Sequence, residues 1–149
     1  MPDFALYPLK ESDIPTLHAL LWQERSSGQV NILMRHMLRA MQREHGLALV
    51  AWQKTQIIGY GQVLKWGNEA EISELIIIEA QRSTGIGTAM IRRFLQFAGG
   101  LSVKYALIGV EETNTRAQSL YERLGFREER RMVLNDAPDI IYLTKQLMI

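Results

Sequence analysis

The sequence predicts a single-domain mixed α/β (α+β) fold, in which about four helices flank a mostly antiparallel sheet. Three observations support this class. The chain has 149 residues, of which 47% are hydrophobic, so it can bury one ordinary core. Some apolar segments have helical spacing, whereas others alternate or run together as strands do. One amphipathic segment separates two apolar strands, which predicts a right-handed parallel β-α-β crossover inside the otherwise antiparallel sheet.

The first half of the chain is predicted to contain a strand, two helices and then three strands. The first strand is expected over Phe4–Lys10, and Ser12 or Asp13 can cap the helix that follows. A second helix is predicted over Asn31–His45, with Gly46 ending it as a C′ glycine. Because the connections between the next three strands are short, these strands should form an antiparallel meander. They are expected over Leu47–Lys54, Ile58–Trp66 and Ala70–Glu79.

The second half is predicted to alternate helices and strands before it ends in a strand pair. A helix starts at Gly85 and runs to about Ala98, and an apolar strand follows over Val103–Val110. Asn114 caps a further helix, which Gly125 ends. That helix is expected over Thr115–Leu124, and the final strands over Glu128–Leu134 and Ile140–Gln146. The predicted order is therefore β-α-α-β-β-β-α-β-α-β-β, in one domain over residues 1–149.

The composition argues against several classes of function. Basic and acidic side chains number 17 and 16, so the net charge of +1 gives no strong attraction to nucleic acid or an anionic membrane. The absence of cysteine excludes disulfides and a cysteine nucleophile, and the three histidines are not at metal-ligand spacing, so no metal site is expected. The longest apolar run, Leu47–Trp52, is far shorter than the roughly 20 residues that span a bilayer. With no signal-peptide pattern at the start, we expect a cytoplasmic protein.

The segment Arg82–Thr88 connects an apolar strand to an amphipathic helix and contains Gly85 and Gly87. Glycines allow a sharp turn and a close approach to a ligand, and the free N–H groups of a helix N-terminus favour a phosphate. The alternative is a tight turn that binds nothing. Two known phosphate loops do not fit, because no glycine is followed by lysine and Met90 stands where a dinucleotide fingerprint has its third glycine.

At these residues the sequence resembles the GNAT superfamily of N-acetyltransferases. The run Arg82-x-x-Gly85-x-Gly87, which follows the strand Leu75–Ile78, is similar to the acyl-CoA-binding motif of that superfamily. About 30 residues later, the segment Asn114–Phe126 matches the pattern Asn-x-x-Ala-x-x-Leu-Tyr-x-x-x-Gly-Phe. The pair of motifs, in this order and spacing, is a specific signal.

The resemblance implies that the two parallel strands splay apart and that acetyl-CoA, as co-substrate, lies in the resulting cleft. Main-chain groups of three strand residues would bind the pantetheine arm and polarise the acetyl carbonyl, as oxyanion-hole donors do. Amides of the glycine loop would hold the pyrophosphate. The expected cofactor-binding residues are Leu75, Ile76, Ile77, Arg82, Ser83, Thr84, Gly85, Ile86, Gly87, Thr88, Asn114 and Arg116. Ser83 stands where the family commonly has glycine, and Glu79 where it often has proline.

Tyr121 occupies the position where the family often has its general acid, which protonates the departing thiolate. A phenol with a pKa near 10 is protonated at neutral pH and can supply that proton. The alternative is that Tyr121 only packs, because it shares one helical face with Ala117, Leu120 and Leu124.

Glu71 and Glu74 are the candidates for the base that deprotonates the attacking amine. They are three residues apart, so on a regular strand they point to opposite faces unless a bulge intervenes. We favour Glu74, acting through a water molecule. The alternative is that Glu74 is a structural ion-pair partner.

The leading functional hypothesis is an acetyl-CoA-dependent N-acetyltransferase that transfers the acetyl group directly to a primary amine of a small molecule or peptide. The runner-up is a catalytically silent acyl-CoA-binding module that senses the cofactor or regulates a partner. We expect no nucleic-acid or membrane partner, and the terminal strands offer a route to a homodimer.

Overall fold

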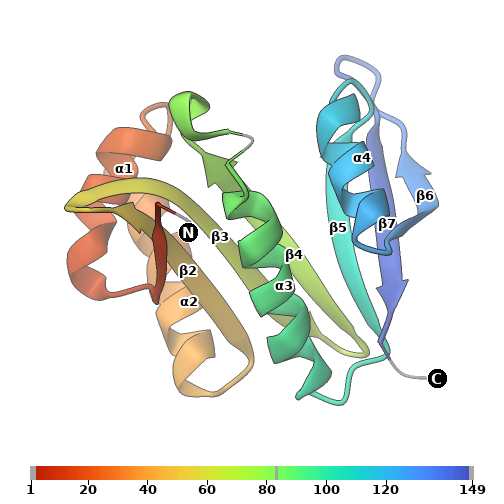
Figure 1. The fold of residues 1–149 in the computed structure, drawn as a ribbon, viewed down its shortest axis with the longest axis horizontal. Helices are drawn as coiled ribbons and strands as arrows, with labels where there is room; N and C mark the ends of the chain where they lie inside the picture. Colours follow the sequence, from red (N-terminus) through yellow and green to blue (C-terminus); the bar gives the residue numbers. More distant parts are fainter. Residues whose placement is uncertain (1–2, 83, 148–149) are drawn as a thin grey trace.

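The computed structural model describes residues 3–82 and 84–147. The described chain forms one mixed sheet of seven strands in the order β1-β2-β3-β4-β5-β7-β6. Figure 1 shows α3 running alongside β4, while α4 lies against the half of the sheet that contains β5 and β7. The strands are β1 Ala5–Pro8, β2 Gly46–Gln53, β3 Gln56–Trp66, β4 Glu69–Ile77, β5 Tyr105–Glu111, β6 Arg127–Met132 and β7 Ile140–Gln146. The helices are α1 Ile14–Leu21, α2 Ser27–Gln42, α3 Ile86–Gly99 and α4 Thr115–Arg123, with short 3-10 turns at Glu11–Asp13 and Glu79–Gln81.

The topology confirms the predicted fold class and element order. Strands β1 to β4 pair antiparallel in sequence order, as the short connections require. The single parallel pair, β4 with β5, is joined by the crossover helix α3. Strand β7 then pairs antiparallel with β5, and β6 forms the outer edge beside β7.

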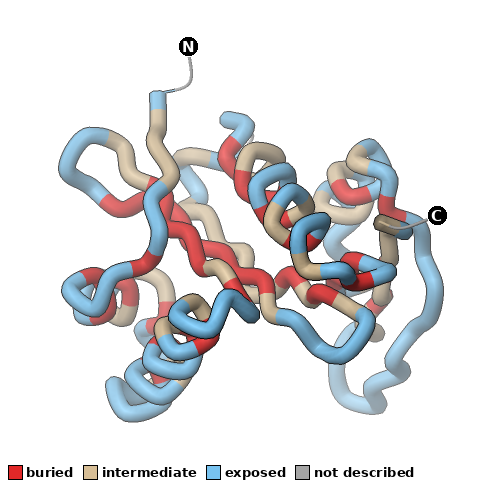
Figure 2. Tube along the Cα trace, turned by 90° about the horizontal axis from the view of Figure 1, so that it is seen from below, coloured by how far each residue is buried: buried red, intermediate tan, exposed pale blue. Residues whose placement is uncertain are grey.

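Two apolar cores lie on the two faces of the sheet. Figure 2 shows the buried segments in the strands between the flanking helices. One core joins the sheet to α1 and α2 through buried residues such as Leu17, Met34 and Tyr60. The other joins it to α3 and α4 and includes Met90 and Phe94. Because successive strand residues point to opposite faces, β2 and β3 supply both cores and read as near-continuous apolar runs.

The boundaries of the second helix were predicted wrongly at both ends. The helix begins at Ser27, four residues before the expected start, because Ser26 and Gln29 form a capping box: the Ser26 side chain accepts from the Gln29 N–H, and the Gln29 side chain accepts from the Ser26 N–H. It ends at Gln42, and Glu44 rather than a glycine adopts the left-handed conformation (φ +59°) after it. Gly46 instead opens β2, where an added Cβ would lie 3.0 Å from a backbone oxygen of β3.

The remaining predicted helix boundaries agree closely with the structure. The Asn114 side chain accepts from the Ala117 N–H at 3.1 Å, and Gly125 follows α4 in the left-handed region (φ +98°). At α1 the predicted cap differs in detail. Asp13 stands at the N-cap position, yet its carboxylate accepts from the backbone N–H of Lys10 rather than from α1.

Truncation of Phe94 tests the core beneath α3. Phe94 is fully buried in the α3 core, so Phe94→Ala should lower the free energy of unfolding by about 3–5 kcal/mol, measured by urea denaturation. Phe97→Ala is the matched control, because the Phe97 side chain on the same helix is only partly buried. Equal losses in the two variants would contradict this assignment of the core.

Candidate active site

A cleft opens where β4 and β5 separate. The two strands pair in parallel only from Glu69–Ile72 with Tyr105–Ile108, although both continue beyond these residues. Figure 1 shows the two ribbons meeting at one end of the sheet and diverging toward the other. The space between them is lined by side chains and backbone of β4, α3 and α4 and has a volume of about 950 Å³.

The lining of this cleft is positively charged. It contains three arginines and no carboxylate among the described residues that form it. Of the predicted cofactor-binding residues, the cleft brings together Leu75, Ile76, Ile77, Arg82, Gly85, Gly87, Thr88, Asn114 and Arg116. A cavity with this composition suits a polyanionic ligand.

The glycine loop forms the end of the cleft at the start of α3. Gly85 is the N-cap of α3 with φ +93°, a conformation that favours glycine, and a Cβ there would meet nothing within 4 Å. The helix therefore starts at a residue with open space beside it, where a ligand can approach the free N–H groups of the first turn. The Arg82 side chain donates from Nε to the Ile77 carbonyl at 3.3 Å, and Thr84 donates to the Gln81 carbonyl at 2.6 Å.

Two of the described residues that the sequence predicts to bind the cofactor do not contribute side chains to the cleft lining. Ser83 lies outside the described residues. The Thr84 hydroxyl is turned toward the preceding backbone, and Ile86 is buried in the α3 core with 1% of its surface exposed. Thr84 and Ile86 can therefore contribute only through their main-chain groups.

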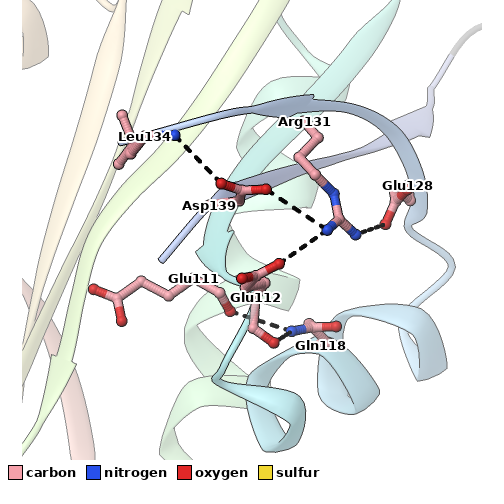
Figure 3. A network of polar contacts seen from close by, with 7 residues as sticks. All are labelled: Glu111, Glu112, Gln118, Glu128, Arg131, Leu134 and Asp139. Carbon is pink, nitrogen blue, oxygen red and sulfur yellow. Dashed lines mark hydrogen bonds and ion pairs between the residues drawn. The ribbon is translucent and has the colours of Figure 1, made fainter. Parts of the chain in front are cut away.

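The opposite wall is formed by α4 and is fastened to the last two strands by a polar network (Figure 3). Gln118 donates to the carbonyls of Glu111 and Glu112, at 3.2 and 2.9 Å. The guanidinium of Arg131 lies 2.9 Å from the Glu112 carboxylate and 3.9 Å from Asp139. The connection between β5 and α4, which carries Asn114, is thus tied to the hairpin of β6 and β7.

Tyr121 lines the cleft from α4 and also packs in the core. The residue is 7% exposed, and its ring lies 6.3 Å from that of Phe126. Its hydroxyl has no hydrogen-bond partner among the described residues. The hydroxyl is not fully buried, because the one fully buried side-chain polar atom without a partner in that part of the chain is Nε1 of Trp22. The Tyr121 hydroxyl is therefore accessible, and Tyr121 is one of the residues that line the cleft. Burial raises the pKa of Tyr121, so the phenol holds its proton above neutral pH.

A β-bulge changes the relation between the two candidate bases. The register of β3 and β4 shifts between Tyr60 and Gln62, and Glu74 has φ +52°. The Ser73 side chain accepts from Gln62, which in turn accepts from the buried Tyr60 hydroxyl of the α1 and α2 core. Glu71, two residues before Ser73, points to that same face, and the bulge turns Glu74 there as well.

The two carboxylates have different environments. Burial raises the pKa of Glu71, the neighbouring Glu69 carboxylate adds to the rise, and Arg130 and the Trp66 side chain act in the opposite direction. Glu74 forms an ion pair with Arg25, whose Nη2 lies 3.2 Å from Oε1. Neither carboxylate lines the cleft, although Glu74 directly precedes the lining residue Leu75.

Sequence reasoning missed two arginines near this region. Arg123 lines the cleft and lies seven residues after Arg116, so helical spacing along α4 was the available signal. Arg25 lies in the connection between α1 and α2, and no local pattern indicated that it would meet Glu74. Among residues 3–82 and 84–147, no cluster of three metal-ligating side chains is present, and no helix is long and apolar enough to cross a membrane.

A family model described as Acetyltransferase (GNAT) family matches residues 14–126. The chain belongs to this family. The matched region includes the bulged strand, the glycine loop, the crossover helix and Tyr121. The resemblance deduced from the two sequence motifs is thereby confirmed.

The GNAT-family chain also matches curated proteins over part of its length. The relatives include uncharacterised N-acetyltransferases from Mycobacterium bovis and Mycobacterium tuberculosis, which are 28% identical to it over 80 residues. This match covers 53% of the chain and 51% of each relative. The chain thus spans about half the length of the curated relatives it matches.

Solved structures confirm the GNAT fold across almost the whole chain. A spermidine N-acetyltransferase from Vibrio cholerae in complex with CoA and spermine has a TM-score of 0.77 at 19% identity, covering 97% of this chain and 96% of that one. The ribosomal-protein-S18-alanine N-acetyltransferase from Escherichia coli has a TM-score of 0.75 at 18% identity, covering 98% and 95%.

Two tyrosines of this GNAT-family protein should hold their protons until the protein unfolds. Burial raises the pKa of Tyr121 and Tyr60, with the Glu74 carboxylate adding to the rise at Tyr60. Unfolded phenols release their protons near pH 10 while these two retain theirs, so the free energy of unfolding should fall as the pH rises above about 10. An ultraviolet titration of tyrosinate absorbance measures the pH at which these phenols lose their protons.

Single Phe variants assign this late ionisation to the two residues. Tyr121→Phe and Tyr60→Phe should each remove amplitude from the ionisation that coincides with unfolding. Tyr7→Phe is the control for removal of a phenol, and it should leave the free energy of unfolding nearly unchanged because Tyr7 is 53% exposed. Early ionisation of Tyr121 would contradict its placement.

Proposed function

We propose that this protein is an acetyl-CoA-dependent N-acetyltransferase that transfers the acetyl group directly to a primary amine. The observation that supports this most is the cleft between the diverging strands β4 and β5. Along one side of the cleft, the edge of β4 that faces β5 has no strand partner after Ile72, and the cleft ends at a glycine-capped helix N-terminus beside arginines. An extended amide-containing chain with a pyrophosphate at one end matches both features.

The lining residues fit the two parts of CoA separately. The edge of β4 that faces β5 has no strand partner after Ile72, so its N–H and C=O groups can bind the amides of a pantetheine arm. The α3 N-terminus from Gly85, with Arg82, Arg116 and Arg123, would hold the phosphates. The absence of a carboxylate in this lining removes the repulsion that an anionic ligand would meet.

The chain's own residues supply the proton transfers. Glu74, through a water molecule, would take one proton from the acceptor ammonium. Tyr121 would give its phenolic proton to the departing sulfur and regain one from the new amide nitrogen, because Tyr121 lines the cleft and its hydroxyl is accessible and protonated. When bound, acetyl-CoA supplies the acyl carbon, where the new C–N bond forms as the C–S bond breaks. The amine loses two protons overall, of which the CoA thiol keeps one and solvent receives the other.

The acceptor is proposed to be an amine of a small molecule or peptide. The solved structures with the same fold include one with spermine bound and one named for a ribosomal-protein alanine, so the fold accommodates both types. A homodimer through the terminal strands stays a prediction, compatible with the exposure of every β6 residue at the sheet edge.

Calorimetry with acetyl-CoA, followed by thiol release with a panel of amines, tests the proposal directly. We expect saturable binding and release of free CoA thiol that depends on the amine. Binding without turnover on any amine would favour the alternative, a catalytically silent acyl-CoA-binding module. No binding at all would contradict both functions and leave the glycine loop as a turn.

Replacement of the Tyr121 hydroxyl separates catalysis from packing. Tyr121→Phe should lower kcat by about 10²-fold or more, because a positioned general acid typically contributes 10² to 10⁴ in rate. The Kd for acetyl-CoA should change little, since the ring and its contact with Phe126 are kept. Tyr7→Phe serves as the control variant, and an unchanged kcat in Tyr121→Phe would leave Tyr121 as a packing residue only.

A further inference from the structure

A pair of opposite charges lies next to the cleft on the side of the sheet covered by α1 and α2. Glu74 directly precedes Leu75, the first cleft-lining residue of β4, and Arg25 comes from the connection between α1 and α2. Nη2 of Arg25 lies 3.2 and 3.3 Å from the two carboxylate oxygens of Glu74. The two side chains are 35% and 25% exposed, so a small molecule can reach them.

The guanidinium of Arg25 has a defined position. Its central carbon lies 5.6 Å from the ring centroid of Trp22, in a cation–π contact. Trp22 is 1% exposed and packs edge-on against Tyr60 at 5.2 Å. The backbone is fixed as well, because His18 donates from Nε2 to the Arg25 carbonyl at 2.7 Å. The positive charge is therefore oriented by the fold rather than free in solvent.

Both members of the pair have unused hydrogen-bonding capacity. Only Nη2 of Arg25 donates to Glu74, and its Nε and Nη1 groups have no acceptor among the described residues. A carboxylate accepts about four hydrogen bonds, and Glu74 has no side-chain partner in that part of the chain besides Arg25. A ligand can therefore form further ion pairs with Arg25 and Glu74 without breaking the one between them.

We propose that the acceptor is a free α-amino acid, whose carboxylate binds the free donors of Arg25 while its amino group faces Glu74. This inference rests on the proposed function and names the substrate class of that site. The opposite charges of an α-amino acid are attached to one carbon atom, and those of Arg25 and Glu74 are also close together. The two pairs can align antiparallel, with the amine beside Glu74 and the adjacent cleft-lining residue Leu75.

The same charges disfavour two other classes of amine. A diamine would bring its second positive charge close to the Arg25 guanidinium, and the two like charges would repel each other. A peptide amino terminus has no carboxylate next to its amine, so it would leave the Arg25 donors unpaired. Arginine binds carboxylates bidentately, which gives the site discrimination between an amino acid and its amide.

The test compares amino acids with their own amides. Thiol release is measured for a panel with apolar, polar and charged side chains, each as the free acid and as the amide, together with 1,4-diaminobutane. The amide has the lower amine pKa, about 8, so a greater share of it is in the reactive free-base form. A preference for the acid therefore reports recognition of the carboxylate. The ratio of kcat/KM for acid over amide should lie between about 10 and 100.

Variants of Arg25 identify the source of this ratio. Arg25→Gln should reduce it to about 1 or below, mainly through KM for the acid, and Arg25→Glu should shift the preference toward the diamine. Arg35→Gln is the matched control and should leave the ratio unchanged. Arg35 also forms an ion pair, with Glu11 at 2.9 Å, but it lies on α2 outside the cleft lining. Calorimetry with acetyl-CoA confirms that each variant is folded.

The possible failures are distinguishable. The inference would be overturned if the wild-type protein had a kcat/KM for an amide or the diamine equal to that for the acid. It would also be overturned if Arg25→Gln left the ratio unchanged. Either result would leave the proposed function intact. Bound acetyl-CoA with no thiol release for any amine would overturn the proposed function, and this inference with it.

Discussion

The early end of the β4–β5 ladder is the constraint on which the other features of the structure depend. Pairing stops after Ile72 and Ile108, so the facing edges beyond them carry backbone donors and acceptors without a strand partner. Such groups are costly when they are buried without partners, so they must face solvent or a ligand. Helices α3 and α4 pack on the separated halves of the sheet and keep the space open. The cleft is thus a property of the sheet topology and of its twist, rather than of surface loops.

The bulge on β4 connects this cleft to the opposite face of the sheet. Without the extra residue, Glu71 and Glu74 would point to opposite faces, and Glu74 would not meet Arg25. Gly61 lies opposite the bulge, where an added Cβ would come within 2.9 Å of the Leu75 side chain, so the small residue leaves room for the side chains that pack there. Backbone geometry at Glu74 thereby sets both the shape of the cleft edge and the charge beside it.

Local signals in the sequence were sufficient to predict most helices and strands. They were insufficient where tertiary contacts determine the boundary of an element. The helix after Asn114 and the final strand Ile140–Gln146 were predicted correctly, because a cap, a C′ glycine and apolar alternation act over short distances. The start of α2 was missed, because the capping box at Ser26 precedes residues with little apolar periodicity. Gly46 was misassigned because a glycine after a helix signals a C′ position, whereas here it is required by close packing against β3.

The sequence by itself determined the family, the order of elements and the residues of the glycine loop, because each is written in contiguous motifs. Only the tertiary structure decided which of these residues meet. It placed Tyr121 both in the core and on the cleft, because its ring packs near Phe126 while the residue also lines the cavity. It also paired Arg25 with Glu74 across 49 positions of the chain. Contacts of that separation depend on the path of the backbone between them, which a bulge of one residue can redirect, so no local pattern encodes them.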